Sequence, residues 1–177
     1  MNNTKTILAI SGSTRSTSTN HNFIKAIAAI IGPGYTITHN QELITSLPHF
    51  NPDLDTETPP PAVTRFRQQL RYAHGILICT PEYAMGVPGT LKNAIDWTVS
   101  SCEFSHKPVA LITASTLGEK AHQSLIETLT VIEAHLTPAT TLLIPNAKTK
   151  IDTHHQITDP TTHTAMLGLV KAFKAIL

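Results

Sequence analysis

The chain carries little charge. Of its 177 residues only 14% are charged, and 13 lysines and arginines against 12 acidic residues leave a formal net charge of +1. A chain this close to neutrality lacks the broad field that holds nucleic acid or an anionic membrane surface. Low charge does not indicate disorder here, because 41% of the residues are hydrophobic, enough for a sizeable core. We therefore expect a small-molecule partner, and neither nucleic acid nor a membrane.

Cysteines and long apolar runs are also scarce. Cys79 and Cys102 are too few for a disulfide framework, which favours a reduced, cytoplasmic setting. No apolar stretch approaches the roughly 20 residues of a membrane-spanning helix, and Ile7–Ile10 is too short for an export signal. The ten histidines lack zinc-type spacing, so no metal is expected. Neither cysteine has a neighbouring motif that would activate it as a nucleophile.

Short apolar runs recur along the chain at Ile7–Ile10, Ile76–Cys79, Val109–Thr113 and Leu142–Ile144. Each run is continuous, which is typical of strands covered on both faces in a parallel sheet. A weaker fifth strand is expected over Tyr35–Thr38. Apolar residues at helical spacing follow the strands and predict helices over about residues 23–31, 63–72, 91–99, 125–136 and 160–177.

This alternation of strands and helices predicts the α/β class, an open parallel sheet with helices on both faces. The length suits a single domain over residues 1–177. The segments 48–61 and 146–158 are expected to be loops, and either is able to edge a binding site.

The segment Ser11–Asn20, after the first strand, has seven hydroxyl side chains, one amide, one glycine and Arg15. Such a loop, opening into a helix, wraps an anion with backbone N–H groups, hydroxyls, a guanidinium and the positive helix end. The alternative is a polar loop in which Ser18 or Asn20 only caps the helix. Neither Gly-x-x-x-x-Gly-Lys-Ser/Thr nor Gly-x-Gly-x-x-Gly is present, so a nucleotide monophosphate remains the better fit.

A second informative segment, Thr80–Trp97, follows the Ile76–Cys79 strand. Its prolines and glycines stiffen or bend the backbone. Glu82 and Tyr83 then come where a planar ring anchored by the phosphate would lie. The alternatives are that Tyr83 is a packing residue and that Glu82 is only a surface carboxylate.

Taken together, Ser11-Gly-Ser-x-Arg-x-x-Ser-x-Asn20, Pro81-Glu-Tyr83 and the run Pro88–Trp97 resemble the NADPH-dependent FMN reductase family, which includes chromate, quinone and azo-dye reductases. The resemblance covers essentially Lys5 to Ser115. It implies a flavodoxin-like fold with a five-stranded sheet in the order 2-1-3-4-5. It further implies noncovalently bound FMN and a homodimer or homotetramer.

The resemblance implies that FMN is held by the loops after three strands, and that no protein side chain is catalytic. Ser13, Arg15, Ser18 and Asn20 would surround the phosphate, and Pro81 to Tyr83 would border the ribityl chain and the ring. Ala84 stands where many relatives have Asn, and Glu119-Lys120 stands where many have a glycine pair. The full implied set is Ser11, Ser13, Arg15, Ser18, Thr19, Asn20, Pro81, Glu82, Tyr83, Ala84 and Ser115.

The function implied is an FMN-dependent oxidoreductase that transfers hydride from NADPH or NADH through FMN to a small acceptor. A quinone, free flavin, chromate or an azo compound would serve, in a ping-pong cycle. The missing protein nucleophile fits this reading, because the flavin carries the reaction. One alternative is a flavodoxin-like one-electron carrier without substantial NAD(P)H oxidation, although such carriers tend to be strongly acidic. Another is a nucleotide-binding regulatory domain without redox activity.

Overall fold

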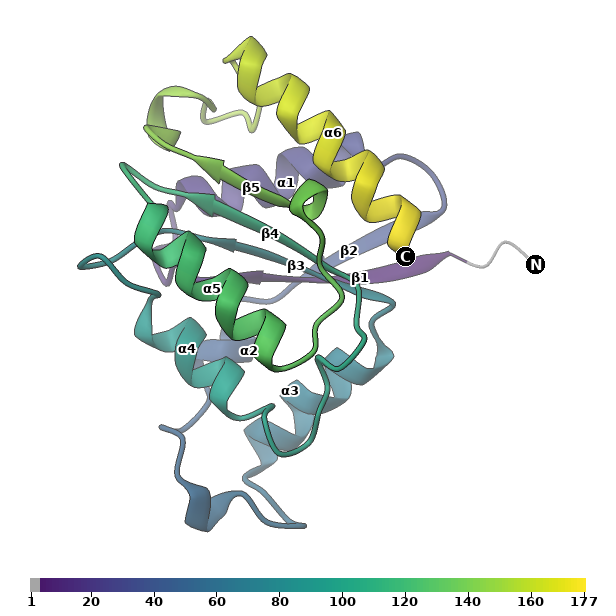
Figure 1. The fold of residues 1–177 in the computed structure, drawn as a ribbon, viewed down its shortest axis with the longest axis vertical. Helices are drawn as coiled ribbons and strands as arrows, with labels where there is room; N and C mark the ends of the chain where they lie inside the picture. The colour runs from purple at the N-terminus through teal and green to yellow at the C-terminus, as the bar shows by residue number, and fades with distance from the viewer. Residues whose placement is uncertain (1–3) are drawn as a thin grey trace.

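The sheet is built from five parallel strands. The computed structural model describes residues 4–177, so residues 1–3 of the predicted domain 1–177 lie outside the described part. The strands lie side by side in the order β2-β1-β3-β4-β5, which confirms the expected order 2-1-3-4-5 (Figure 1). They are β1 (Lys5–Ser11), β2 (Tyr35–His39), β3 (Gly75–Thr80), β4 (Val109–Ala114) and β5 (Thr141–Ile144).

Helices cover both faces of this sheet, as predicted (Figure 1). One face carries α1 (Thr19–Ile30) and α6 (Pro160–Ile176), and the other carries α2 (Glu42–Thr45), α3 (Pro61–Tyr72), α4 (Gly89–Asp96) and α5 (Glu119–Val131). Short 3₁₀ helices span Pro52–Leu54, Pro138–Thr140 and Ala147–Thr149.

The sheet separates two apolar cores that share its strands. Successive residues of a strand point to opposite faces, so Ile7 packs with α1 and α6 while Leu8 packs with the helices of the other face. Every residue of β3 and β4 is buried. This two-sided burial is the physical reason for the continuous apolar runs in the sequence.

Two helices end earlier than their apolar spacing predicts. The helix expected to continue to Leu136 ends at Val131, because Glu133 adopts a left-handed φ of 60° and the Ala134 N–H turns back to the Leu129 carbonyl. Similarly, α4 ends at Asp96, and Val99 beyond it is exposed. Local turn geometry therefore overrides apolar periodicity at these helix ends.

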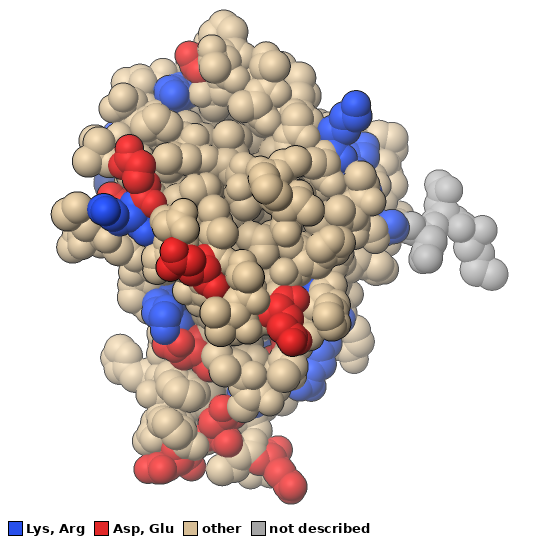
Figure 2. All heavy atoms as spheres, viewed as in Figure 1, with Lys and Arg blue, Asp and Glu red and all other residues tan. Residues whose placement is uncertain are grey.

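The surface agrees with the low charge of the sequence. On the face shown in Figure 2, basic and acidic side chains are scattered over a mostly uncharged surface, without an extended basic area. Among residues 4–177, no helix is both long enough and apolar enough to cross a membrane.

Candidate functional site

A cavity of about 410 Å³ opens where the strands end, which is the usual ligand-binding edge of an open α/β sheet. Its volume falls within the roughly 300–1,000 Å³ typical of small-molecule and cofactor sites. The loops after β1, β3, β4 and β5 all contribute. The lining residues are Ser13, Arg15, Thr17, Ser18, Thr19, Asn20, Pro81, Glu82, Tyr83, Ala114, Ser115, Thr116, Asn146, Ala147, Lys148 and Thr149.

The loop after β1 is shaped by Gly12. Its backbone N–H donates to the Cys79 carbonyl at 3.0 Å, which ties the loop to the end of β3. A Cβ at this position would lie 2.0 Å from Oγ1 of Thr80, so only glycine fits without displacement. The next residue, Ser13, lines the cavity, and its hydroxyl lies 3.4 Å from the hydroxyl of Tyr83. The close approach at Gly12 thus brings the two predicted motifs together.

The first turn of α1 lies at the cavity and has the features of an anion-binding helix start. Ser18 is the N-cap, and its Oγ accepts the Asn20 N–H at 3.2 Å. Within residues 4–177, the backbone N–H groups of Ser18 and Thr19 make no hydrogen bond. The first turn has no acidic residue, so the positive end of the helix is not neutralised locally. Capping and anion binding are therefore compatible here, rather than alternatives.

Arg15 adds a full positive charge to this end. It is exposed and lines the cavity. In the described part of the chain, no carboxylate lies within 4.0 Å of its guanidinium. Hydroxyl groups, free N–H groups and a guanidinium form a donor set that fits a phosphate monoester such as that of FMN.

Asn20 has a structural role that the sequence did not reveal. Its side-chain amide donates to the Ala114 carbonyl at 3.3 Å, and its Oδ1 accepts from the Cys79 thiol at 3.3 Å. These bonds hold the start of α1 over the ends of β3 and β4. Burial raises the pKa of the Cys79 thiol, so this sulfur stays protonated and is no nucleophile.

Glu82 connects the two loops that form the other end of the cavity. Its backbone N–H donates to Oγ of Ser115 at 3.2 Å. Its carboxylate accepts the N–H of Gly118 at 3.3 Å and the N–H of Ala121 at 2.9 Å, at the start of α5. Glu82 therefore caps the start of α5 and is not a free surface carboxylate.

Tyr83 is partly exposed at the cavity. The side chain is 46% accessible, and its backbone exchanges two hydrogen bonds with Gly86, of 3.0 and 2.9 Å. Between them, Ala84 and Met85 take positive φ values of 48° and 59°. The backbone of Tyr83 is consequently held by a tight turn, while the residue itself is only partly used in packing.

The cavity contains all the residues implied by the sequence except Ser11 and Ala84. Ser11 is buried beneath the loop, where its Oγ accepts the Ser13 N–H at 3.2 Å. Ala84 lies in the turn beyond Tyr83. Whether any of the implied residues contacts FMN stays a prediction.

Sequence reasoning missed several lining residues: Thr17, Ala114, Thr116 and the segment from Asn146 to Thr149. This segment belongs to the loop 146–158, which was expected only to be able to edge a site. It is fixed to the loop after β4, because the Asn146 N–H donates to Thr116 and the Ala147 N–H to Ser115, at 3.1 and 2.9 Å. The sequence feature that could have pointed to this segment as part of the site was its position directly after a predicted strand.

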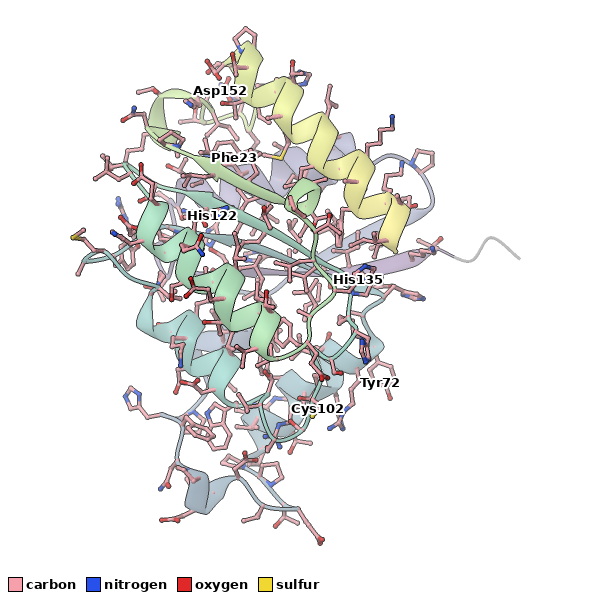
Figure 3. The ribbon with its side chains drawn as sticks, viewed as in Figure 1. Phe23, Tyr72, Cys102, His122, His135 and Asp152 are labelled. Atoms are coloured by element: carbon pink, nitrogen blue, oxygen red, sulfur yellow. The ribbon has the colours of Figure 1, made fainter. Side chains whose placement is uncertain are left out.

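Other titratable groups of the described chain include Cys102 and His122. Cys102 is exposed and lies apart from His122, which is on α5 (Figure 3). Nδ1 of His122 lies 2.9 Å from the Thr113 hydroxyl, and burial lowers the pKa of this imidazole. Within residues 4–177, no three His, Cys, Asp or Glu side chains gather as metal ligands. The expectation of no metal remains a prediction.

A sequence profile described as NADPH-dependent FMN reductase matches residues 6–149, which include every loop of the cavity. The chain belongs to this family. The resemblance seen in the two sequence motifs is thereby confirmed, and with it an oxidoreductase that uses FMN and NAD(P)H.

Two individual relatives and one solved structure are also similar to this chain. The NAD(P)H-dependent FMN reductase of Pseudomonas aeruginosa is 36% identical over 158 residues, covering 86% of this chain and 84% of that protein. A quinone reductase of Pseudomonas putida is 32% identical over 118 residues, covering 65% and 62%. The structure of the NAD(P)H:(acceptor) oxidoreductase FerB from Paracoccus denitrificans superposes with a TM-score of 0.75 at 24% identity, covering 96% and 94%. The flavodoxin-like fold is confirmed.

Proposed function

We propose that this reductase takes hydride from NADPH or NADH and reduces a small acceptor by a ping-pong mechanism. The candidate acceptors are a quinone, free flavin, chromate or an azo compound. Relatives named FMN reductase, quinone reductase and azoreductase support this range. The observation that carries the proposal is one open cavity with an anion-binding end at α1 and a second end beside Tyr83. We further propose a cytoplasmic homodimer or homotetramer.

The residues of the cavity divide into two binding roles. Arg15, the Ser13 and Ser18 hydroxyls and the start of α1 would hold the FMN phosphate. The loops joined by Glu82 would border the rest of the cofactor, largely through backbone groups. FMN, when bound, supplies the capacity to accept and release hydride. The protein binds and orients the reactants and leaves one side of the cavity open to them.

The donor and the acceptor would use this open cavity in turn. Shared use of one cavity predicts that NAD(P)H leaves before the acceptor enters. Double-reciprocal plots of initial rate at several fixed acceptor concentrations should therefore be parallel. Intersecting lines, which mark an obligatory ternary complex, would contradict the proposed cycle.

The decisive experiment is anaerobic mixing of FMN-loaded protein with NADPH or NADH while the visible flavin absorbance is followed. Rapid bleaching, then recovery on adding 1,4-benzoquinone, supports the proposal. Tight FMN binding without bleaching by either donor would favour the alternative, a one-electron carrier. Failure to take up FMN at all would favour a regulatory domain without redox activity.

Arg15→Ala tests the phosphate end. Loss of a charge-assisted contact should weaken FMN binding by about 1.5 kcal/mol, near the lower end for such bonds because the side chain is exposed. Flavin fluorescence titration gives the dissociation constant. Arg65→Ala is the matched control, since Arg65 is also exposed but lies outside this cavity. An unchanged dissociation constant in Arg15→Ala would remove Arg15 from the site.

A further inference from the structure

Lys148 is a second cation in the cavity that neither sequence motif includes. It is exposed and lines the cavity. Across the described residues, no carboxylate lies within 4.0 Å of its ammonium group. Its backbone is held firmly, because the neighbouring Ala147 N–H donates to Ser115 and the Thr149 N–H donates to Asn146 at 2.9 and 3.0 Å. A fixed segment therefore presents an uncompensated charge to the site.

The start of α1 lies between this segment and the loop that carries Arg15. Asn20 reaches the Ala114 carbonyl at the end of β4, next to the strand that precedes Lys148. Asn22, one turn into the helix, donates to the Asp152 carbonyl at 3.2 Å, in the loop between β5 and α6 (Figure 3). The loop beyond Lys148 is thus bonded directly to α1, whereas the strand before Lys148 is linked to α1 only through β4.

Among the described residues, neither Asp152 nor Glu82 forms an ion pair with Arg15 or Lys148. Oδ1 of Asp152 accepts the N–H groups of His154 and Gln156 at 2.9 and 2.8 Å, within its own turn. Glu82 is the acidic residue among the lining residues, and it is engaged at the start of α5. The positive end of α1, Arg15 and Lys148 therefore all border the same cavity.

We propose that Lys148 binds a phosphate monoester dianion in this cavity. The inference rests on the proposed function and deepens it. A lysine ammonium is a compact point charge that suits phosphate without requiring a bidentate geometry. Two reactants carry such a group: FMN at the end of its ribityl chain, and NADPH on its adenosine ribose. Riboflavin and NADH lack these phosphates and are the matched probes.

The test uses Lys148→Met in the full chain, with Lys150→Met as the control. Lys150 is close in sequence but does not line the cavity. Fluorescence titration gives the dissociation constants of FMN and riboflavin, and initial rates give KM for NADPH and NADH. If the FMN phosphate is the ligand, Lys148→Met should bind FMN about 10-fold more weakly and riboflavin as before. Added salt should reduce this difference.

If the NADPH phosphate is the ligand, KM should rise about 10-fold for NADPH and stay unchanged for NADH, with FMN binding unaffected. Either pattern supports the inference. The inference is overturned if Lys148→Met leaves both dissociation constants and both KM values unchanged, or if it weakens the binding of FMN and of riboflavin equally. Wild-type protein that binds neither FMN nor NADPH would contradict the proposed function as well. Wild-type protein that binds FMN while Lys148→Met changes nothing would contradict this inference alone.

Discussion

At the residue scale, the shape of the cavity depends on hydrogen bonds within the protein that the residue types alone do not predict. Glu82 and Asn20 belong to motifs that imply ligand binding, yet their side chains bond to other parts of the protein. Both bring separate loops to one cavity. They position the start of α1 and the loop after β4, and direct contact of either side chain with FMN stays a prediction.

Gly12→Ala should damage both stability and the phosphate end. The new Cβ would lie 2.0 Å from Oγ1 and 2.7 Å from Cβ of Thr80, so the loop or β3 must shift. Overpacking of this kind costs about 1–3 kcal/mol, which urea denaturation would measure. FMN binding should weaken in the same variant. Gly89→Ala is the control, because a Cβ there meets no atom within 4 Å. Equal unfolding free energies for Gly12→Ala and Gly89→Ala would contradict the predicted clash with Thr80.

At the element scale, the strands were predictable and the helix ends less so. Burial on both faces selects continuous apolar runs, and this signal located β1, β3, β4 and β5. The end of α5 was not predictable from apolar spacing, because it is set by the left-handed Glu133. The four-residue α2 is too short to show a helical period.

The predicted start of the last helix at residue 160 is confirmed, and Asp159 is its N-cap. The Asp159 carboxylate accepts the hydroxyl and the N–H of Thr162, both at 2.7 Å. These hydrogen bonds to Thr162 lower the pKa of Asp159. The unfolded-state pKa is about 3.9, so the stabilisation is complete above that pH and is lost as the pH falls through the lower folded value.

Asp159→Asn tests this cap. Asparagine caps helices about as well as aspartate but does not titrate. Urea midpoints measured from about pH 5 to about pH 2 should fall further for the wild type than for the variant, since only the wild type loses a charged cap. Parallel pH profiles for the two proteins would show that the carboxylate contributes nothing to acid stability.

At the scale of the whole molecule, the sequence predicted the sheet order and the two motif-bearing loops because a family resemblance joined them. It did not predict that the segment from Asn146 to Thr149 lines the cavity as well. That segment carries no motif, and its place depends on β5 pairing beside β4 and on backbone bonds to Ser115 and Thr116. Such long-range placement is visible only once the chain is folded.

Trp97 provides a probe of whether residues 1–177 behave as one domain. It is the single tryptophan, is fully buried in the core beneath α3 to α5, and donates from its indole to the Pro48 carbonyl at 2.9 Å. This burial makes Trp97 a core residue of the folded chain. Its fluorescence should therefore report loss of one core, while far-UV circular dichroism reports the helices of both faces.

The two signals should report urea unfolding with the same midpoint, because both cores are built on the same strands and neither can persist without the sheet. FMN at about 100 times its dissociation constant should raise the unfolding free energy by about 2.7 kcal/mol in both signals. A tryptophan transition that precedes the loss of helix signal, or an FMN effect on only one signal, would show that the two faces unfold independently. Stabilisation of both by FMN would link the cavity at the strand ends to the whole sheet.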